Sequence, residues 1–134
     1  MNPIETNKAL ALEFLELAFA NRVDDALSRL SPVATWWVLG EPDRLKVAGT
    51  KTRSQIERLL KGLERMVPGG MQMVVTGITA EGERVAVEIE AEGACANGQT
   101  YHNHYHILLK IRDGLIVSVR EYMDTLHLSD VLSA

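Results

Sequence analysis

The stretch Tyr-His-Asn-His-Tyr-His at residues 101–106 places three imidazoles at every second position, with two phenols and an amide between them. Side chains alternate across a β-strand, so a strand here would separate the two sets onto opposite faces. One face would then carry groups that titrate or bind metals, and the other would carry hydrogen-bonding groups. The role of the stretch depends on which set points into the protein.

The residues that follow indicate the direction of each set. The row of phenols and amide continues with Ile107, Leu109 and Ile111. The histidine row continues with Lys110 and Arg112. Because apolar rows of a strand face the core, we expect the phenols and amide to point inward and the imidazoles to face solvent or a second subunit.

Tyr101, Asn103 and Tyr105 are therefore candidate ligand-binding groups on an otherwise apolar wall. A buried hydroxyl or amide needs a hydrogen-bond partner, and an apolar pocket with a few convergent polar groups is typical of a ligand site. In the alternative, these groups satisfy only one another or the backbone. Both interpretations stay open at this point.

A metal site on His102, His104 and His106 is geometrically permitted, because two histidines at i and i+2 of a strand can share a zinc ion. Such a site still needs a third ligand and a partner behind each ring. The sequence contains no companion HxxxH motif or cysteine pair. We therefore expect no metal, and partly exposed imidazoles on the outer face of a sheet.

Glu121 is the best candidate for an acid or base. It shares the face of Val119 and Met123 in a β-rich segment, so it points inward if they do. A carboxylate in an apolar pocket has a raised pKa, which suits proton transfer near neutral pH. The alternative is a salt bridge at a strand edge.

Three further residues are candidate ligand contacts. Trp36 and Trp37 alternate on an expected strand, so one indole faces the interior, and Trp36 is assigned as a flat wall for a ring-shaped ligand. Met123 and Asp124 complete the set at the end of the last strand. Asp124 has an alternative role as the cap of a terminal helical turn.

Four segments contain helix signals, and strand signals occur once in the first half of the chain and throughout most of the second. Helix starts are expected at Asn2-Pro3 and at Thr52, and hairpin turns at Glu81-Gly82, Asn97-Gly98 and Asp113-Gly114. Short helices are expected over residues 24–30 and 126–132, and strands over residues 33–39, 71–80, 83–93, 100–111 and 115–123. Helices followed by long antiparallel strands predict an α+β fold, in which a strongly curved sheet and its helices enclose a pocket.

Composition excludes several classes of protein. A chain of 134 residues predicts a single domain over residues 1–134. Its net charge of −4, without a run of basic residues, argues against nucleic-acid and membrane-surface partners. The single cysteine, Cys95, cannot form an internal disulfide, and the N-terminal segment is interrupted by charges, so we expect a cytoplasmic protein.

The segment NGQTYHNHYHILLKIRDGLIVSVREYMDT, residues 97–125, resembles the SnoaL-like group of the nuclear-transport-factor-2-like (NTF2-like) superfamily. The tyrosine-rich strand, the Asp-Gly turn and the final Glu-Tyr-Met-Asp strand carry the resemblance, and the order of elements agrees over the whole chain. The resemblance implies a cone with a deep apolar pocket, a homodimer formed through the outer sheet face, and side-chain chemistry without a cofactor.

The chain departs from two enzymes of that superfamily. Ketosteroid isomerases keep a general-base Asp at about the position of Trp36-Trp37, and that base is missing. Epoxide hydrolases use an Arg-x-Asp pair that matches Glu88-Ile89-Glu90 and an Asp that matches Glu121, so the arginine is missing. The local alternation places Glu88 and Glu90 on the outer face, whereas the family register places them inside; we favour the outer face.

These observations predict a cofactor-independent enzyme of the ketosteroid-isomerase-like group. It would isomerise, cyclise or dehydrate a small, apolar, ring-containing carbonyl compound. Glu121 would be the base, and Tyr105, Tyr101 and Asn103 would donate hydrogen bonds to the developing oxyanion. The alternative is a module of the same superfamily that binds a small molecule or dimerises without catalysis.

Overall fold

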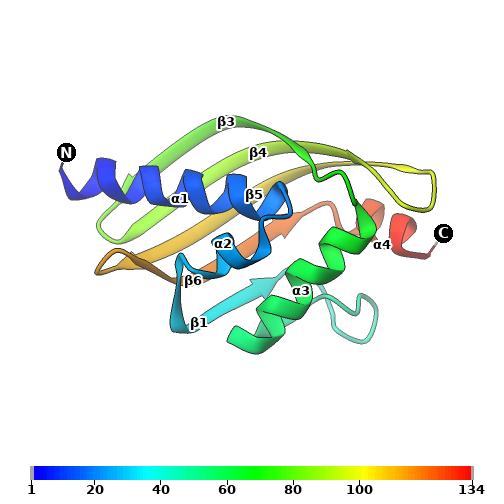
Figure 1. The fold of residues 1–134 in the computed structure, drawn as a ribbon, viewed down its shortest axis with the longest axis horizontal. Coiled ribbons are helices and arrows are strands. Elements are labelled where there is room, and N and C mark those ends of the chain that lie inside the picture. Colours follow the sequence, from blue (N-terminus) through cyan, green and yellow to red (C-terminus); the bar gives the residue numbers. More distant parts are fainter. Residues whose placement is uncertain (1, 134) are drawn as a thin grey trace.

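Two capped helices line the hollow of the protein in the computed structural model, which describes residues 2–133 (Figure 1). Helix α1 (Pro3–Phe19) begins with Asn2, whose Oδ1 accepts the Glu5 backbone N–H at 2.8 Å. Helix α3 (Arg53–Met66) begins after Thr52, whose backbone N–H donates to the Gln55 side chain at 2.9 Å. Both predicted helix starts are confirmed, since these bonds satisfy amides that have no partner in the first turn.

The remaining helices are short. Helix α2 (Val23–Leu27) ends earlier than the predicted 24–30, because the chain already enters the first strand at Leu30. Helix α4 (Thr125–Ser133) extends the predicted C-terminal turn by a residue at each end. No helix among residues 2–133 is long and apolar enough to cross a bilayer.

Six strands form one mixed sheet in the order β2-β1-β6-β5-β4-β3. Strands β1 and β6 pair in parallel, and all other neighbours pair antiparallel. The strands are β1 (Leu30–Val38), β2 (Gly49–Lys51), β3 (Gln72–Glu81), β4 (Arg84–Ala94), β5 (Thr100–Arg112) and β6 (Leu115–Met123).

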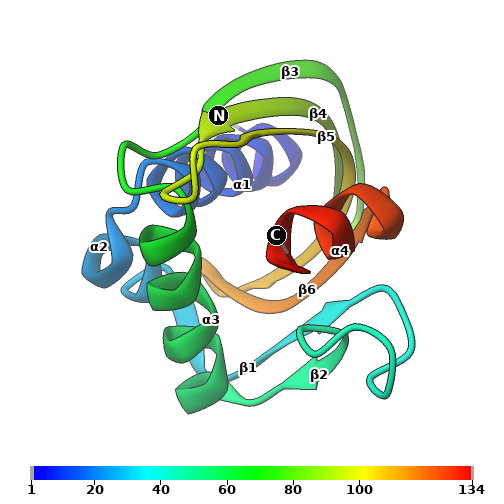
Figure 2. The same cartoon turned by 90° about the vertical axis from the view of Figure 1, so that its right-hand side faces the viewer.

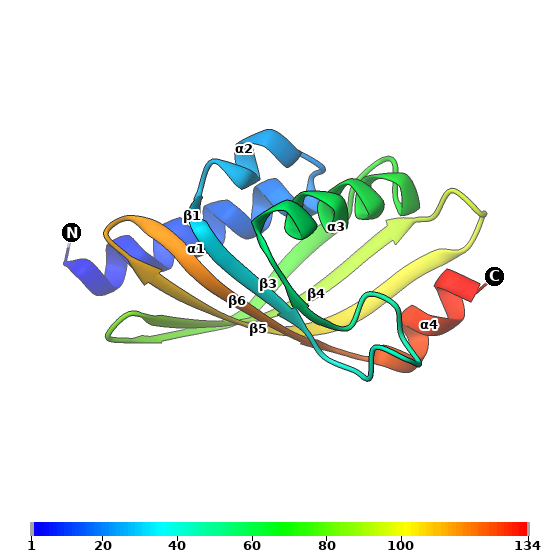
Figure 3. The same ribbon diagram turned by 90° about the horizontal axis from the view of Figure 1, so that it is seen from below.

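The sheet is strongly curved and stays open. Figure 2 shows the strands from β3 to β2 curling round α1, α3 and α4, which lie on the concave side. The same arrangement seen from below shows no helix on the convex face, among residues 2–133 (Figure 3). The α+β prediction and the curved cone are confirmed, since long twisted strands coil and the helices cover only the hollow side.

Local chemistry explains two details of the sheet. Asp113 and Gly114 both have positive φ, 53° and 75°, as a type I′ hairpin turn requires, and they join β5 to β6 as predicted. Strand β1 starts three residues earlier than predicted and includes Pro32. Its register with β6 shifts between Leu30 and Thr35, where a proline without an N–H is tolerated.

Strand β2 is not among the predicted strands. This strand has only three residues, Gly49–Lys51, and no apolar alternation. It forms because it can pair with the free side of β1, with Trp36 opposite Lys51. A strand that forms only because a partner strand is available has no recognisable pattern in its own sequence.

Candidate functional site

Strand β5 separates its two sets of side chains as predicted. Tyr101, Asn103 and Tyr105 are 0%, 1% and 7% exposed and point into the hollow. His102 and His104 are exposed on the convex face, together with the third histidine of the row. The apolar continuation of the inner row is fully buried, so the core fixes the orientation of the whole strand.

Glu121 projects from β6 to the inside and accepts a hydrogen bond from the Trp36 Nε1–H at 3.0 Å. The parallel pairing of β1 and β6 makes this contact possible, because it sets Val38 opposite Glu121 and Trp36 one inward position away. Trp36 is only 3% exposed, and an indole N–H can only donate, so the carboxylate supplies its partner.

Burial raises the pKa of the Glu121 carboxyl to about 7. The hydrogen bond from Trp36 and the positive charge of Lys51 act in the opposite direction, because both favour the ionised form. Glu121 lines a cavity, and the surface that it keeps faces that cavity. A carboxyl with this pKa is poised to accept or return a proton near neutral pH.

Side chains from α1, α3, α4 and the inner sheet face enclose a cavity of about 210 Å³. Its lining includes the polar side chains of Tyr101, Tyr105 and Glu121, together with Arg58, which is exposed. The apolar wall includes Phe19, Val38, Leu60, Leu63, Met66 and Leu128. An apolar hollow with three convergent polar groups has the composition of a small-molecule site.

The two phenols are hydrogen-bonded to each other, with 2.6 Å between their oxygens. Burial raises the pKa of Tyr101 to about 12 and raises that of Tyr105 well above its usual value. Both phenols therefore stay protonated and act as neutral donors throughout the pH range in which Glu121 titrates.

The side-chain amide of Asn103 makes all its hydrogen bonds within the protein. Its Nδ2 donates to the Tyr101 oxygen at 2.8 Å and to the Asp124 carbonyl at 3.0 Å, and its Oδ1 accepts the backbone N–H groups of His104 and Asp124. The amide is saturated inside the protein and lies outside the cavity wall. Asn103 thus positions Tyr101, and the expectation that it donates to a ligand stays a prediction.

Two predicted ligand contacts also lie elsewhere. Asp124 is exposed, and its Oδ1 accepts the backbone N–H groups of Leu126 and His127 at 3.0 and 3.3 Å. It caps α4, as the alternative interpretation had it, because a carboxylate suits the unpaired amides of a first turn. Met123 is buried in the core and is not part of the cavity wall. Trp36 and Tyr101 do line the cavity, and their contact with a ligand stays a prediction.

The glutamates of β4 lie on the convex face. Glu88 is exposed, and Glu90 is partly exposed and pairs with His104 across the strands. The outward interpretation is confirmed, because the alternating valines and isoleucine of β4 fill the core. The residues that match the acid pair of epoxide hydrolases are therefore absent from the cavity wall.

Lys51 is the residue near the site that the sequence did not reveal. Its Nζ donates to the carbonyls of Ala48 and Gly49 at 3.0 and 3.2 Å. Partial burial lowers the pKa of Lys51, and the nearby charge of Glu121 opposes that shift. Only the pairing of β2 with β1 brings this cation toward Glu121, so no local pattern could have located it.

The curved sheet with its covered hollow is an NTF2-like fold, and the solved structures with which it aligns agree. An NTF2-like protein from Burkholderia pseudomallei K96243 aligns with a TM-score of 0.82 and 17% identity, over 96% of this chain and 98% of that one. A SnoaL-like protein from Jannaschia sp. CCS1 aligns with a TM-score of 0.80 and 18% identity, over 100% of this chain and 96% of that one. TerC, co-crystallised with polyporic acid, aligns at 0.79 and 21%, over 96% and 99%.

A model of the SnoaL-like domain matches residues 11–119, so the chain belongs to the SnoaL-like family. No curated protein matches the sequence. At these identities the solved structures establish the fold alone, and the chemistry has to be argued from the cavity.

Proposed function

We propose that this protein is a cofactor-independent enzyme that moves a proton next to the carbonyl group of a small, ring-containing compound. The observation that carries the proposal is Glu121, a carboxyl with a pKa of about 7 that faces an apolar cavity also lined by two protonated phenols. A base and a pair of oxyanion donors in one cavity are the two parts that such a reaction needs.

The hydrogen bonds of Asn103, Tyr101 and Tyr105 form a chain that leads to the cavity. The Tyr101 oxygen accepts from Asn103, so Tyr101 can in turn donate to Tyr105. The hydrogen of Tyr105 is then directed to the cavity, where a substrate carbonyl can accept it. Each donor strengthens the next, so Tyr105 becomes a better donor as negative charge grows on the substrate oxygen.

In the proposed reaction, the Glu121 carboxylate removes the proton from the carbon beside the carbonyl. The electron pair of the broken C–H bond forms an enolate, whose oxygen accepts the hydrogen bond from Tyr105. For an isomerase, the Glu121 carboxylic acid returns the proton to a different carbon of the enolate. For a cyclase, the enolate carbon attacks a second carbonyl, whose π bond breaks to give an alkoxide that takes the proton from Glu121. For a dehydratase, the carbonyl re-forms as a hydroxyl on the next carbon leaves as water with the proton from Glu121.

The size of the cavity restricts the substrate. A volume of about 210 Å³ exceeds the roughly 150 Å³ of an engineered cavity known to hold benzene, but lies below the roughly 300–1,000 Å³ of most ligand sites. One ring with a few substituents fits. The structure of TerC with polyporic acid shows that a relative of the same fold was crystallised with an organic acid.

The small cavity also favours the second candidate function, a module that binds a small molecule without turnover. The two candidates differ in one observable. In D₂O, a catalytic base that faces the bound ligand exchanges the protons on the carbon beside the ligand's carbonyl for deuterium. A binding module does not accelerate this exchange.

The test begins with a panel of cyclic ketones and lactones, screened by thermal shift. Compounds that bind are incubated with protein in D₂O, and proton NMR follows the loss of the signals beside the carbonyl. We expect wild-type protein to accelerate exchange and Glu121→Gln to lose at least about 100-fold of that rate while keeping its affinity. Glu88→Gln, an equivalent change on the convex face, serves as the control and should keep the full rate.

Ligands that bind without exchange by wild-type protein would establish the binding module instead. Exchange that persists in Glu121→Gln would overturn the assignment of the base.

A further inference from the structure

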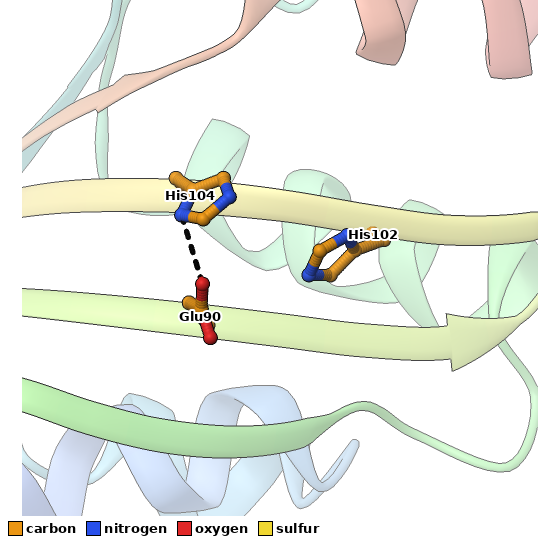
Figure 4. Close-up of side chains that lie close together, drawn as sticks. All are labelled: Glu90, His102 and His104. Atoms are coloured by element: carbon orange, nitrogen blue, oxygen red, sulfur yellow. Dashed lines mark ion pairs between the residues drawn. The ribbon is translucent and has the colours of Figure 1, made fainter.

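We propose that the convex face of the sheet carries a binding site for a divalent transition metal ion, formed by His102, His104 and Glu90. The two histidines point outward from β5, and Glu90 points outward from the neighbouring strand β4 (Figure 4). The site is independent of the proposed function, because these side chains lie on the opposite face of the sheet from the cavity.

The register of β4 and β5 places a third metal ligand beside the two histidines, which the sequence alone did not identify. Glu90 lies opposite His104, and Glu92 lies opposite His102. Residues directly opposite on antiparallel strands have their side chains on the same face, so a carboxylate lies beside the imidazole pair. The third ligand is therefore placed by the pairing of two strands, and no short motif of the sequence encodes it.

The distances suit a tetrahedral ion. All three residues offer a ligand atom within 4.8 Å of the other two, and Glu90 Oε1 lies 3.3 Å from His104 Nδ1. Two ligand atoms bound at about 2.0–2.2 Å to one tetrahedral ion are separated by about 3.3–3.6 Å. The Glu90–His104 pair already has this separation. The centroids of the His102 and His104 rings are 5.4 Å apart, so the His102 ring has to turn toward the Glu90–His104 pair to bind the same ion.

That movement is available because the cluster lies at the surface. His102 and His104 are exposed, and the side chain of His104 retains 70% of its accessible surface. The backbone N–H of His102 donates to His127 Nε2 at 3.2 Å. This bond involves the backbone of His102 and not its ring, so the ring can rotate.

The local charge favours a cation. Glu88 and Glu92 flank Glu90 on the same face of β4, and β3 contributes the uncharged Gln72 and Val74 opposite Glu92 and Glu90. This row of carboxylates creates a local negative field that attracts a metal ion. Two imidazoles and one carboxylate match the donor preference of zinc and leave a fourth position for water.

The experiment is a calorimetric titration of the whole protein with Zn²⁺ alone at neutral pH. We expect one ion per chain, and a dissociation constant that rises at least about tenfold in each of His102→Ala, His104→Ala and Glu90→Gln. His106→Ala is the matched control, because it removes the next exposed imidazole of the same row and lies outside the cluster. This variant should bind as the wild type does.

A second readout identifies the ligands directly. On addition of zinc, the imidazole NMR signals of His102 and His104 should shift while those of His106 stay in place. The proposal is overturned if millimolar zinc produces no binding, or if His106→Ala weakens binding as much as His104→Ala does. All four variants change side chains of the convex face that are exposed or partly exposed, so circular dichroism should show a common fold.

Discussion

Replacing Glu121 with glutamine should stabilise the protein at alkaline pH and leave its stability at acidic pH nearly unchanged. Burial raises the folded-state pKa of Glu121 from 4.5 to about 7. Between these values the folded state keeps a proton that the unfolded state has lost, so wild-type stability falls as the pH rises through this window. Glutamine is neutral at every pH and has a carbonyl that can accept the Trp36 hydrogen bond.

The size of the effect follows from the two pKa values. The difference between about 7 and 4.5 is about 2.5, and each pH unit corresponds to about 1.4 kcal/mol, so the ionised carboxylate costs about 3 kcal/mol of folding free energy above pH 7. Below pH 4.5 both states are protonated and the cost disappears. The variant should therefore gain up to about 3 kcal/mol at alkaline pH only.

Urea unfolding at a series of pH values, from about 4 to about 8, measures this difference without knowledge of the substrate. Glu88→Gln is the control, since Glu88 is exposed on the convex face and should show no comparable gain. A gap between Glu121→Gln and wild type that stays constant across the series would refute the reasoning. So would a Glu121→Gln protein that is less stable than wild type at alkaline pH.

Three further predictions concern the surroundings of the site and the outer face. Trp36→Phe removes the donor to Glu121, so the pKa of Glu121 should rise by about one further unit, as carbon-13 NMR of labelled glutamate would show. Asn103→Ala removes one of the two partners of the Tyr101 hydroxyl and the partner of three backbone groups of His104 and Asp124, so it should lower the free energy of unfolding by about 3 kcal/mol, measured in urea. Sedimentation should give twice the mass of the chain if the convex face forms a homodimer, and Trp37→Ser, in the aromatic part of that face, should give a monomer.

The orientation of β5 could be predicted because a strand has only two faces. Three buried apolar residues after the tyrosines decide the side on which all earlier residues lie. The same reasoning placed Glu121 inside and Glu88 outside. Helix caps at Asn2 and Thr52 were predictable for a related reason, since each cap depends on residues no more than three positions apart.

Contacts between distant segments could not be predicted. The bond from Trp36 to Glu121 joins residues 85 positions apart and depends on the parallel pairing of β1 with β6. Asn103 was assigned to a ligand because the sequence does not show that its amide is consumed by Tyr101 and by the backbone near Asp124. The type of a residue determines which hydrogen bonds its side chain can form. The packing of the folded chain determines which of these bonds are formed within the protein.

The amino-acid sequence by itself determined the class of the fold, the inner and outer faces of its long strands, and an acid of the correct type on the inner face. Alternation and capping are local rules, so they can be followed along the chain. Only the tertiary structure showed that Trp36 and Lys51 lie near Glu121 and affect its pKa. It also showed that Asn103 donates a hydrogen bond to Tyr101 and that Glu90 lies beside two histidines. Those relations follow from strand pairing, which brings together groups whose separation along the chain carries no information about their distance in space.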